Sequence, residues 1–245
     1  DIVKRRRIIE QDFAEKRGAN SDTIDRNRVL VLASSGEVAI AKSVIFERLR
    51  FNLSDEYMLE TIALLETYEM DQHESEYWLN TLLQLFPNNA IGGVIRIIKS
   101  AEVSKKWEVV FEKSKVILSE DGGNWFAILA AAKSNAAIGD WEVSAKYWDM
   151  YAKLRSLSPQ EVYDSSRSYY NSKRFESVVG ITSRNTNWEE REENILELLI
   201  RSHYNLNSDD LCVEFSERIL EINSKSEVGL RFQSRSLVRL GRISD

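Results

Sequence analysis

A cation recurs every 34 residues along the chain (133 − 99 = 34), at Lys99, Lys133, Arg167, Arg201 and Arg235. Only 33 of the 245 residues are Lys or Arg, so five in one register are improbable by chance. Ammonium and guanidinium groups bind carboxylates and phosphates, and Arg can do so with two parallel hydrogen bonds. The series predicts an anion-binding surface. The alternative is five unrelated helix residues that are simply solvated.

Neighbouring positions would complete such a surface. Four residues before each cation stand Ile95, Leu129, Tyr163, Glu197 and Arg231, and three residues after it stand Glu102, Ala136, Tyr170, Tyr204 and Val238. The surface would be apolar toward Leu129 and Ala136, and aromatic and basic toward Tyr170 and Tyr204. We expect the binding residues to be the five cations together with Tyr163, Tyr170 and Tyr204.

Catalytic and metal-binding motifs are missing from the sequence. Two histidines, His73 and His203, and one cysteine, Cys212, are too few for the common zinc sites without carboxylates. His73 has no second His at the spacing of zinc proteases, and no Walker loop or Gly-rich dinucleotide motif occurs. We expect both histidines to be structural and Cys212 to be a small buried apolar residue. The sequence therefore predicts a non-catalytic chain without cofactor or metal.

The elements that would position the cations are marked by polar turns with the same period. The residues that follow these turns are His73, Trp107, Trp141, Phe175, Asp209 and Ile243. Each turn separates two apolar-periodic stretches of about a dozen residues, which is the length of a helix rather than a strand. A period of about 34 residues built from helix, turn and helix is typical of one class of solenoid.

The periodicity predicts an all-α chain of about fourteen helices. Residues 1–21 form an N-terminal helix and linker, and 22–245 form a solenoid of about six helix pairs plus an unpaired final helix. The expected pairs are 22–35 with 37–52, 56–70 with 73–86, 90–103 with 106–118, 125–138 with 141–157, 159–171 with 174–184, and 188–206 with 209–222, followed by 226–240 alone.

The apolar faces of these helices predict the core. Trp148 should lie between helices rather than in solvent. The other expected core residues are Val94, Ile97, Ile98, Val110, Phe111, Ile128, Ala131, Val178, Leu196, Leu199, Val213 and Phe215.

The repeats resemble the tetratricopeptide repeat (TPR) family. Gly139-Asp140-Trp141 is similar to that family's turn, and Ser144 with Trp148 is similar to the small and large positions of its second helix. Tyr169 to Phe175 resembles the end of a first helix and its turn, and Pro87 the closing proline. Leu199-Ile200 departs from the pattern, because small residues are expected there. The resemblance implies antiparallel helix pairs in a right-handed superhelix, with the first helices, and so the cations, on the concave surface.

Composition and charge give further expectations. A net charge of −6 argues against general binding to nucleic acid, although a local basic surface is compatible with it. A single cysteine cannot form an internal disulfide, which fits a reducing compartment, so we expect a cytoplasmic protein. No apolar run approaches the length of a membrane span, and no signal peptide is visible. Since the chain does not begin with Met and stops where a helix should start, we expect it to be a piece of a longer protein.

Two functions from different classes fit these features. The first is a non-catalytic protein-interaction scaffold that binds an acidic peptide or partner in a basic concave groove. The alternative is a TPR-like accessory region of a larger enzyme, for example a polysaccharide-building glycosyltransferase, used for oligomerisation or for binding an anionic polymer. Because the final helix lacks its mate, we also expect self-association through that helix.

Overall fold

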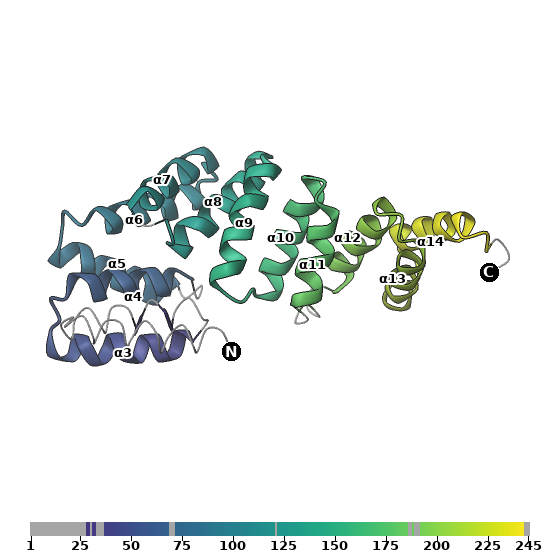
Figure 1. The fold of residues 1–245 in the computed structure, drawn as a ribbon. Helices are drawn as coiled ribbons and strands as arrows, with labels where there is room; N and C mark the ends of the chain where they lie inside the picture. Colours follow the sequence, from purple (N-terminus) through teal and green to yellow (C-terminus); the bar gives the residue numbers. More distant parts are fainter. Residues whose placement is uncertain are drawn as a thin grey trace, which may run out of the picture. The chain divides into compact units, whose positions relative to one another are not determined.

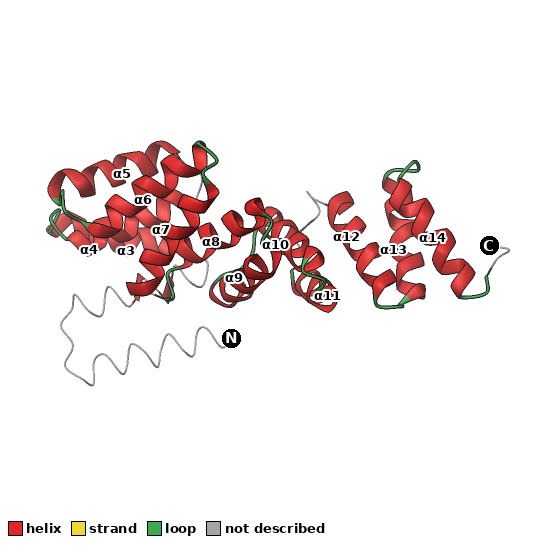
Figure 2. Cartoon of the chain, turned by 90° about the horizontal axis from the view of Figure 1, so that it is seen from above, coloured by secondary structure: helices red, strands yellow, loops and turns green. Residues whose placement is uncertain are grey.

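The structure is a computed structural model. It describes residues 28–29, 31–32, 37–68, 72–120, 122–185, 188 and 192–242. Every regular element within these residues is an α-helix (Figure 2), which confirms the all-α prediction. The N-terminal helix predicted within 1–21 and most of the helix predicted over 22–35 lie outside the described residues.

Twelve helices are delimited in the described part of the chain (Figure 1). They are α3 (Val38–Phe51), α4 (Glu56–Tyr68), α5 (Gln72–Leu85), α6 (Ala90–Val103), α7 (Trp107–Glu120), α8 (Trp125–Ile138), α9 (Trp141–Leu154), α10 (Pro159–Asn171), α11 (Phe175–Arg184), α12 (Glu192–Asn205), α13 (Asp209–Ile222) and α14 (Glu227–Arg239).

The backbone conformation of the turns repeats with the 34-residue period. The residues with left-handed φ are Lys105 (54°), Gly139 (87°), Lys173 (60°), Asn207 (56°) and Gly241 (73°), each 34 positions after the last. The N–H group of the next residue donates to the carbonyl five positions earlier in every case, at 2.8–2.9 Å. This is the Schellman arrangement, which ends a helix and reverses the chain. It explains why each first helix is followed at once by an antiparallel second helix.

The predicted turn positions match the start of the second helices. Trp107, Trp141, Phe175 and Asp209 are the first residues of α7, α9, α11 and α13. α5 begins at Gln72, one residue before the predicted His73. Ile243 lies outside the described residues.

The described residues form two compact units. Unit 1 comprises the described residues up to Ser134 together with Met150–Ser156, and unit 2 comprises Asn135–Asp149 together with the described residues from Leu157 onward. In unit 1, α4 packs on α5 and α6 on α7; in unit 2, α10 packs on α11 and α12 on α13. The single solenoid over 22–245 and its right-handed superhelix stay predictions.

Most of the predicted core is buried. Eight of its members are buried, namely Ile98, Val110, Ile128, Ala131, Val178, Leu196, Leu199 and Val213. Trp148 is completely buried, as expected, whereas Val94, Phe111 and Phe215 are half-buried. The prediction for Ile97 was wrong, because its side chain is 41% exposed. Ile97 and Ile98 are adjacent, so they point about 100° apart on a helix, and α6 buries the face that carries Ile98.

The last described helix, α14, packs on α13 and α12. The helices α13 and α14 approach closely, since a Cβ added at Gly229 would lie 2.8 Å from the Cγ2 atom of Ile219. Part of α14 is uncovered within the described structure: Leu230 is 49% and Val238 62% exposed. The expected partner helix would begin outside the described residues, and self-association through α14 stays a prediction.

Candidate anion-binding face

Each cation of the 34-residue series is followed directly by a serine. The last four of these serines, Ser134, Ser168, Ser202 and Ser236, are completely buried. Successive residues on a helix point about 100° apart. On α10, α12 and α14, each of which has both buried and exposed residues, a buried serine at the next position therefore sets the same rotation, so Arg167, Arg201 and Arg235 occupy equivalent faces of their helices. The recurring Lys-Ser or Arg-Ser pair is visible in the sequence and could have indicated this shared orientation.

Two of the buried serines, Ser168 and Ser236, mark close contacts between a second helix and the next first helix. The Oγ atoms of Ser144, on α9, and Ser168, on α10, are 2.9 Å apart and hydrogen bonded. The equivalent contact in a later repeat joins α13 to α14, where Cys212 lies beside Ser236. Small side chains leave little room between these helices, so the orientation of α10 and α14, and of the cations they carry, is well determined.

The two cations of unit 1 are compensated within that unit. Nζ of Lys99 donates to Oγ of Ser75 at 2.6 Å and lies 3.8 Å from a carboxylate oxygen of Glu76. Burial lowers the pKa of Lys99, and Glu76 and Glu102 oppose that shift. Burial raises the pKa of Glu102, whereas Lys133 and Lys99 act to lower it. Glu102 is therefore an internal counter-charge to both Lys99 and Lys133.

Two cations of unit 2, Arg167 and Arg235, differ from Lys99 and Lys133 in their exposure and contacts. Arg167 is exposed, and its guanidinium carbon lies 5.2 Å from the ring centroid of Trp141. Arg235 on α14 is also exposed. Neither makes an ion pair with any residue that the structure describes. A guanidinium group on an aromatic face is held in place without losing its charge or its donors.

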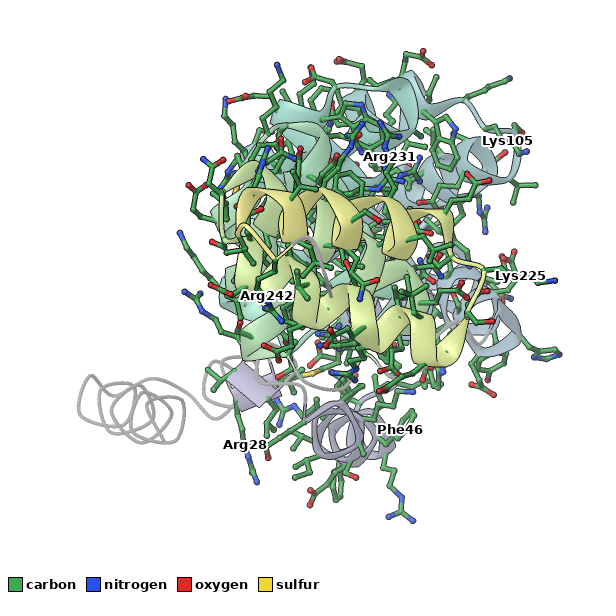
Figure 3. All side chains as sticks on the ribbon, turned by 90° about the vertical axis from the view of Figure 1, so that its right-hand side faces the viewer. Arg28, Phe46, Lys105, Lys225, Arg231 and Arg242 are labelled. Carbon is green, nitrogen blue, oxygen red and sulfur yellow. The ribbon has the colours of Figure 1, made fainter. Side chains whose placement is uncertain are left out.

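Arg201 and Arg231 share one aromatic ring. Their guanidinium carbons lie 5.9 Å and 5.8 Å from the ring centroid of Phe232. Arg201 also lies 3.6 Å from a carboxylate oxygen of Glu197 on its own helix, in a pair that is partly exposed on both sides. Arg231 is exposed on the side of α14 that faces away from α13 (Figure 3).

The predicted tyrosines are half-buried and differ in their contacts. The ring centroid of Tyr170 lies 5.6 Å from that of Phe175. The rings of Tyr204 and Phe232 meet edge to face with their centroids 4.9 Å apart, and the guanidinium of Arg239 lies over the Tyr204 ring at 3.8 Å. Tyr163 is placed on α10, four residues before Arg167. Two of the three tyrosines thus pack against neighbouring rings.

Tyr169 is a polar residue of this region that lies outside the predicted binding set. Its hydroxyl donates to a carboxylate oxygen of Asp149 at 2.9 Å, and Arg174 pairs with the other oxygen at 2.8 Å. Burial raises the pKa of Tyr169, and Asp149 raises it further. Since the contact joins residues 20 apart, only the packing of α9 on α10 could reveal it.

Four arginines on the first helices of unit 2 define what we call the arginine face: Arg167, Arg201, Arg231 and Arg235. The helices that carry them are neighbours, because α12 contacts both α10 and α14. Arg239 is excluded, because its guanidinium is engaged by three groups around the turn between α12 and α13: the carbonyl oxygen of Tyr204 at 3.2 Å, Oδ1 of Asn207 at 3.5 Å and a carboxylate oxygen of Asp209 at 3.5 Å. Of the predicted apolar part of the surface, Leu129 is buried and Ala136 is half-buried. The arginine face has the chemistry to bind carboxylates or phosphates.

No group of three or more His, Cys, Asp and Glu residues that could hold a metal ion occurs in the described residues. None of the helices described is long and apolar enough to cross a membrane. Cys212 is buried, with its Sγ atom 3.6 Å from the carbonyl oxygen of Ile200, and burial raises the pKa of the thiol. His203 is buried and stacks on Phe215 at 5.3 Å. Cys212 and His203 pack in the interior, as expected.

No family model matches the chain, and no curated protein matches it. Solved structures match it over most of its length. A structure of Pseudomonas aeruginosa PilF has a TM-score of 0.49 and 12% identity, with 92% of this chain and 99% of that chain covered. A tetratricopeptide repeat protein from Parabacteroides merdae has a TM-score of 0.38 and 14% identity, with 91% and 88% covered.

A structure of Naa15/Naa10 bound to HypK-THB also matches, with a TM-score of 0.47 and 13% identity. The match covers 93% of this chain but only 35% of that chain. Because these scores are below 0.5, we rest the helix-pair architecture on the turns and helices of this chain itself.

Proposed function

We propose that this chain is a non-catalytic protein-interaction scaffold, and that the arginine face of unit 2 binds an acidic peptide or an acidic segment of a partner protein. The observation that carries the proposal is the contrast between the two units. Lys99 is engaged within unit 1, by Glu76 at 3.8 Å and by Ser75 at 2.6 Å, and Glu102 lies close enough to Lys99 and Lys133 for both to act on its pKa, whereas Arg167 and Arg235 are exposed and form no ion pair with the described part of the chain. Exposed cations that make no ion pair within the described residues are available to an acidic ligand, even on a protein of net charge −6.

The arrangement favours many weak contacts over one strong contact. Each exposed ion pair with a ligand carboxylate contributes about 0–1 kcal/mol. Four arginines on three neighbouring helices act together, because aligned like charges add their fields over the same surface. The affinity should therefore depend on the number of acidic residues in the ligand and should fall as salt is added.

Aromatic support lowers the entropic cost of this binding. Trp141 holds the guanidinium of Arg167, and Phe232 holds those of Arg201 and Arg231. Ordering a free side chain at an interface costs about 0.5–1.5 kcal/mol. Side chains already stacked on a ring have lost part of that freedom before the ligand arrives.

The test is the affinity of the whole chain for a fluorescein-labelled peptide of alternating aspartate and serine, measured by fluorescence anisotropy. The variant Arg167→Glu with Arg235→Glu reverses two exposed charges that support no described ion pair. The matched control is Arg184→Glu with Lys225→Glu, which makes the same change in net charge at exposed positions off the first helices. Circular dichroism verifies that both variants keep their helices.

We expect the Arg167 and Arg235 variant to lose at least about tenfold in affinity, equivalent to about 1.4 kcal/mol. The control should lose less than about twofold, because only the long-range field changes there. Equal losses in the two variants would mean that net charge, rather than the arginine face, attracts the peptide. No binding by the unaltered chain would refute the proposal outright.

We also propose a cytoplasmic location for this scaffold. The sequence has a single cysteine, Cys212, which is buried as a free thiol, so the chain has no internal disulfide, as is usual in a reducing compartment.

A further inference from the structure

We propose that Arg201, Arg231 and Arg235 form a subsite for a phosphate monoester, such as a phosphoserine side chain, within the partner peptide. The inference rests on the proposed function, because it assigns one part of the arginine face to one chemical group of the ligand. It goes beyond that function in predicting that phosphorylation of the partner, and not its acidity alone, controls binding.

Two guanidinium groups from different helices lie near the same aromatic ring. Arg201 comes from α12 and Arg231 from α14, and both lie within 6 Å of the centroid of Phe232, at 5.9 Å and 5.8 Å. The Phe232 ring is itself held by the core, since it packs against a buried cluster that includes Leu196 and Ile200. Both guanidinium groups are thus held near one fixed ring.

Arg235 adds a third guanidinium on the same side of α14. It follows Arg231 by four residues, and side chains at that spacing are neighbours on a helix surface. Glu227, four residues before Arg231, is the nearest acidic residue along α14, and the structure records no ion pair between them. Glu197 is the counter-charge to Arg201, but its 3.6 Å contact is partly exposed and can be replaced by a stronger ligand.

A dianion fits this arrangement better than a carboxylate does. Two or three guanidinium groups in one place repel each other, and one carboxylate cancels only one of their charges. A phosphate monoester carries a charge of about −1.5 to −2 at pH 7 and three acceptor oxygens. It can therefore accept hydrogen bonds from Arg201 and Arg231 at the same time, with acceptors left for Arg235.

The test uses three labelled peptides that are identical except at one central position, which is serine, glutamate or phosphoserine. Aspartates flank that position, so that all three peptides satisfy the general requirement for acidity. Their affinities are measured for the whole chain, for the variant Arg201→Gln with Arg231→Gln, and for the control Arg184→Gln with Lys225→Gln. Glutamine keeps a polar side chain without the charge, which limits the effect on folding.

We expect the phosphoserine peptide to bind about tenfold more tightly than the glutamate peptide. The Arg201 and Arg231 variant should lose this preference, and the control should keep it. Inorganic phosphate added at millimolar concentration should compete for the phosphoserine peptide more than for the glutamate peptide.

Three results separate this inference from the proposed function. If the phosphoserine and glutamate peptides bind equally well, the phosphate subsite is refuted while acidic-peptide binding stands. If a phosphoserine preference survives in the Arg201 and Arg231 variant, the subsite lies elsewhere and the assignment is wrong. If none of the peptides binds, both the subsite and the proposed function fail.

Discussion

The packing of α14 on α13 decides where Arg231 and Arg235 lie. A substitution at Gly229 tests this packing. A Cβ added there would lie 2.8 Å from the Cγ2 atom of Ile219 and 3.0 Å from the Cγ atom of Leu220. Overpacking of this kind costs about 1–3 kcal/mol. Ala is also the better helix former, by about 0.5–1 kcal/mol. We therefore expect Gly229→Ala to lower the free energy of unfolding by about 1–2 kcal/mol.

Gly180 provides the matched control. It also lies within a helix, α11, but a Cβ added there would meet nothing within 4 Å. Gly180→Ala should therefore only gain helix propensity and raise the free energy of unfolding by about 0.5–1 kcal/mol. The assay is urea unfolding of both variants followed by far-ultraviolet circular dichroism. The packing of α14 on α13 would be refuted if Gly229→Ala were as stable as Gly180→Ala.

Three further predictions concern the interior and the turns. Trp148→Ala should cost about 3–5 kcal/mol, because the buried indole leaves a large cavity; a thermal midpoint within error of the unaltered chain would contradict this. Burial lowers the pKa of His203, an effect that Glu214 opposes, so the unfolded chain takes up this proton at higher pH than the folded chain. The free energy of unfolding should thus fall as the pH drops from the usual pKa of about 6.5 through the folded-state pKa, and His203→Gln should flatten that slope in melts at several pH values. Lys173→Gly should raise the melting midpoint, because Lys173 has a φ of 60° that costs a non-Gly residue about 1 kcal/mol; the same change at Lys146, in the middle of α9, should lower it.

The repeat could be predicted because it is a local property of the chain. The end of each first helix needs a left-handed residue, and Gly139, Asn207 and Gly241 are residue types that adopt that conformation readily. The aromatic residues Trp141 and Phe175 start the next helices at the same spacing. Such signals lie within a few residues of each other, so periodicity alone locates them.

The candidate site could be predicted only in part. Whether a cation has a partner within the protein depends on contacts between residues far apart in sequence. Lys99 and Arg167 hold the same place in their repeats, yet Lys99 contacts Ser75, 24 residues earlier, and Arg167 stacks on Trp141. The sharing of Phe232 by Arg201 and Arg231 depends on how α12 packs on α14. No local pattern distinguishes a compensated cation from an available one.

The central claim is that the arginines on the first helices of unit 2 contact an acidic ligand, and side-chain NMR tests it directly. With isotope-labelled arginine, the Nε–Hε signals can be followed while the aspartate and serine peptide is added. We expect the signals of Arg167, Arg201, Arg231 and Arg235 to shift together and to saturate at one affinity. The signals of Arg184 and Arg218, on the second helices, should stay in place. Shifts confined to Arg184 and Arg218, or spread evenly over all arginines, would contradict the claim.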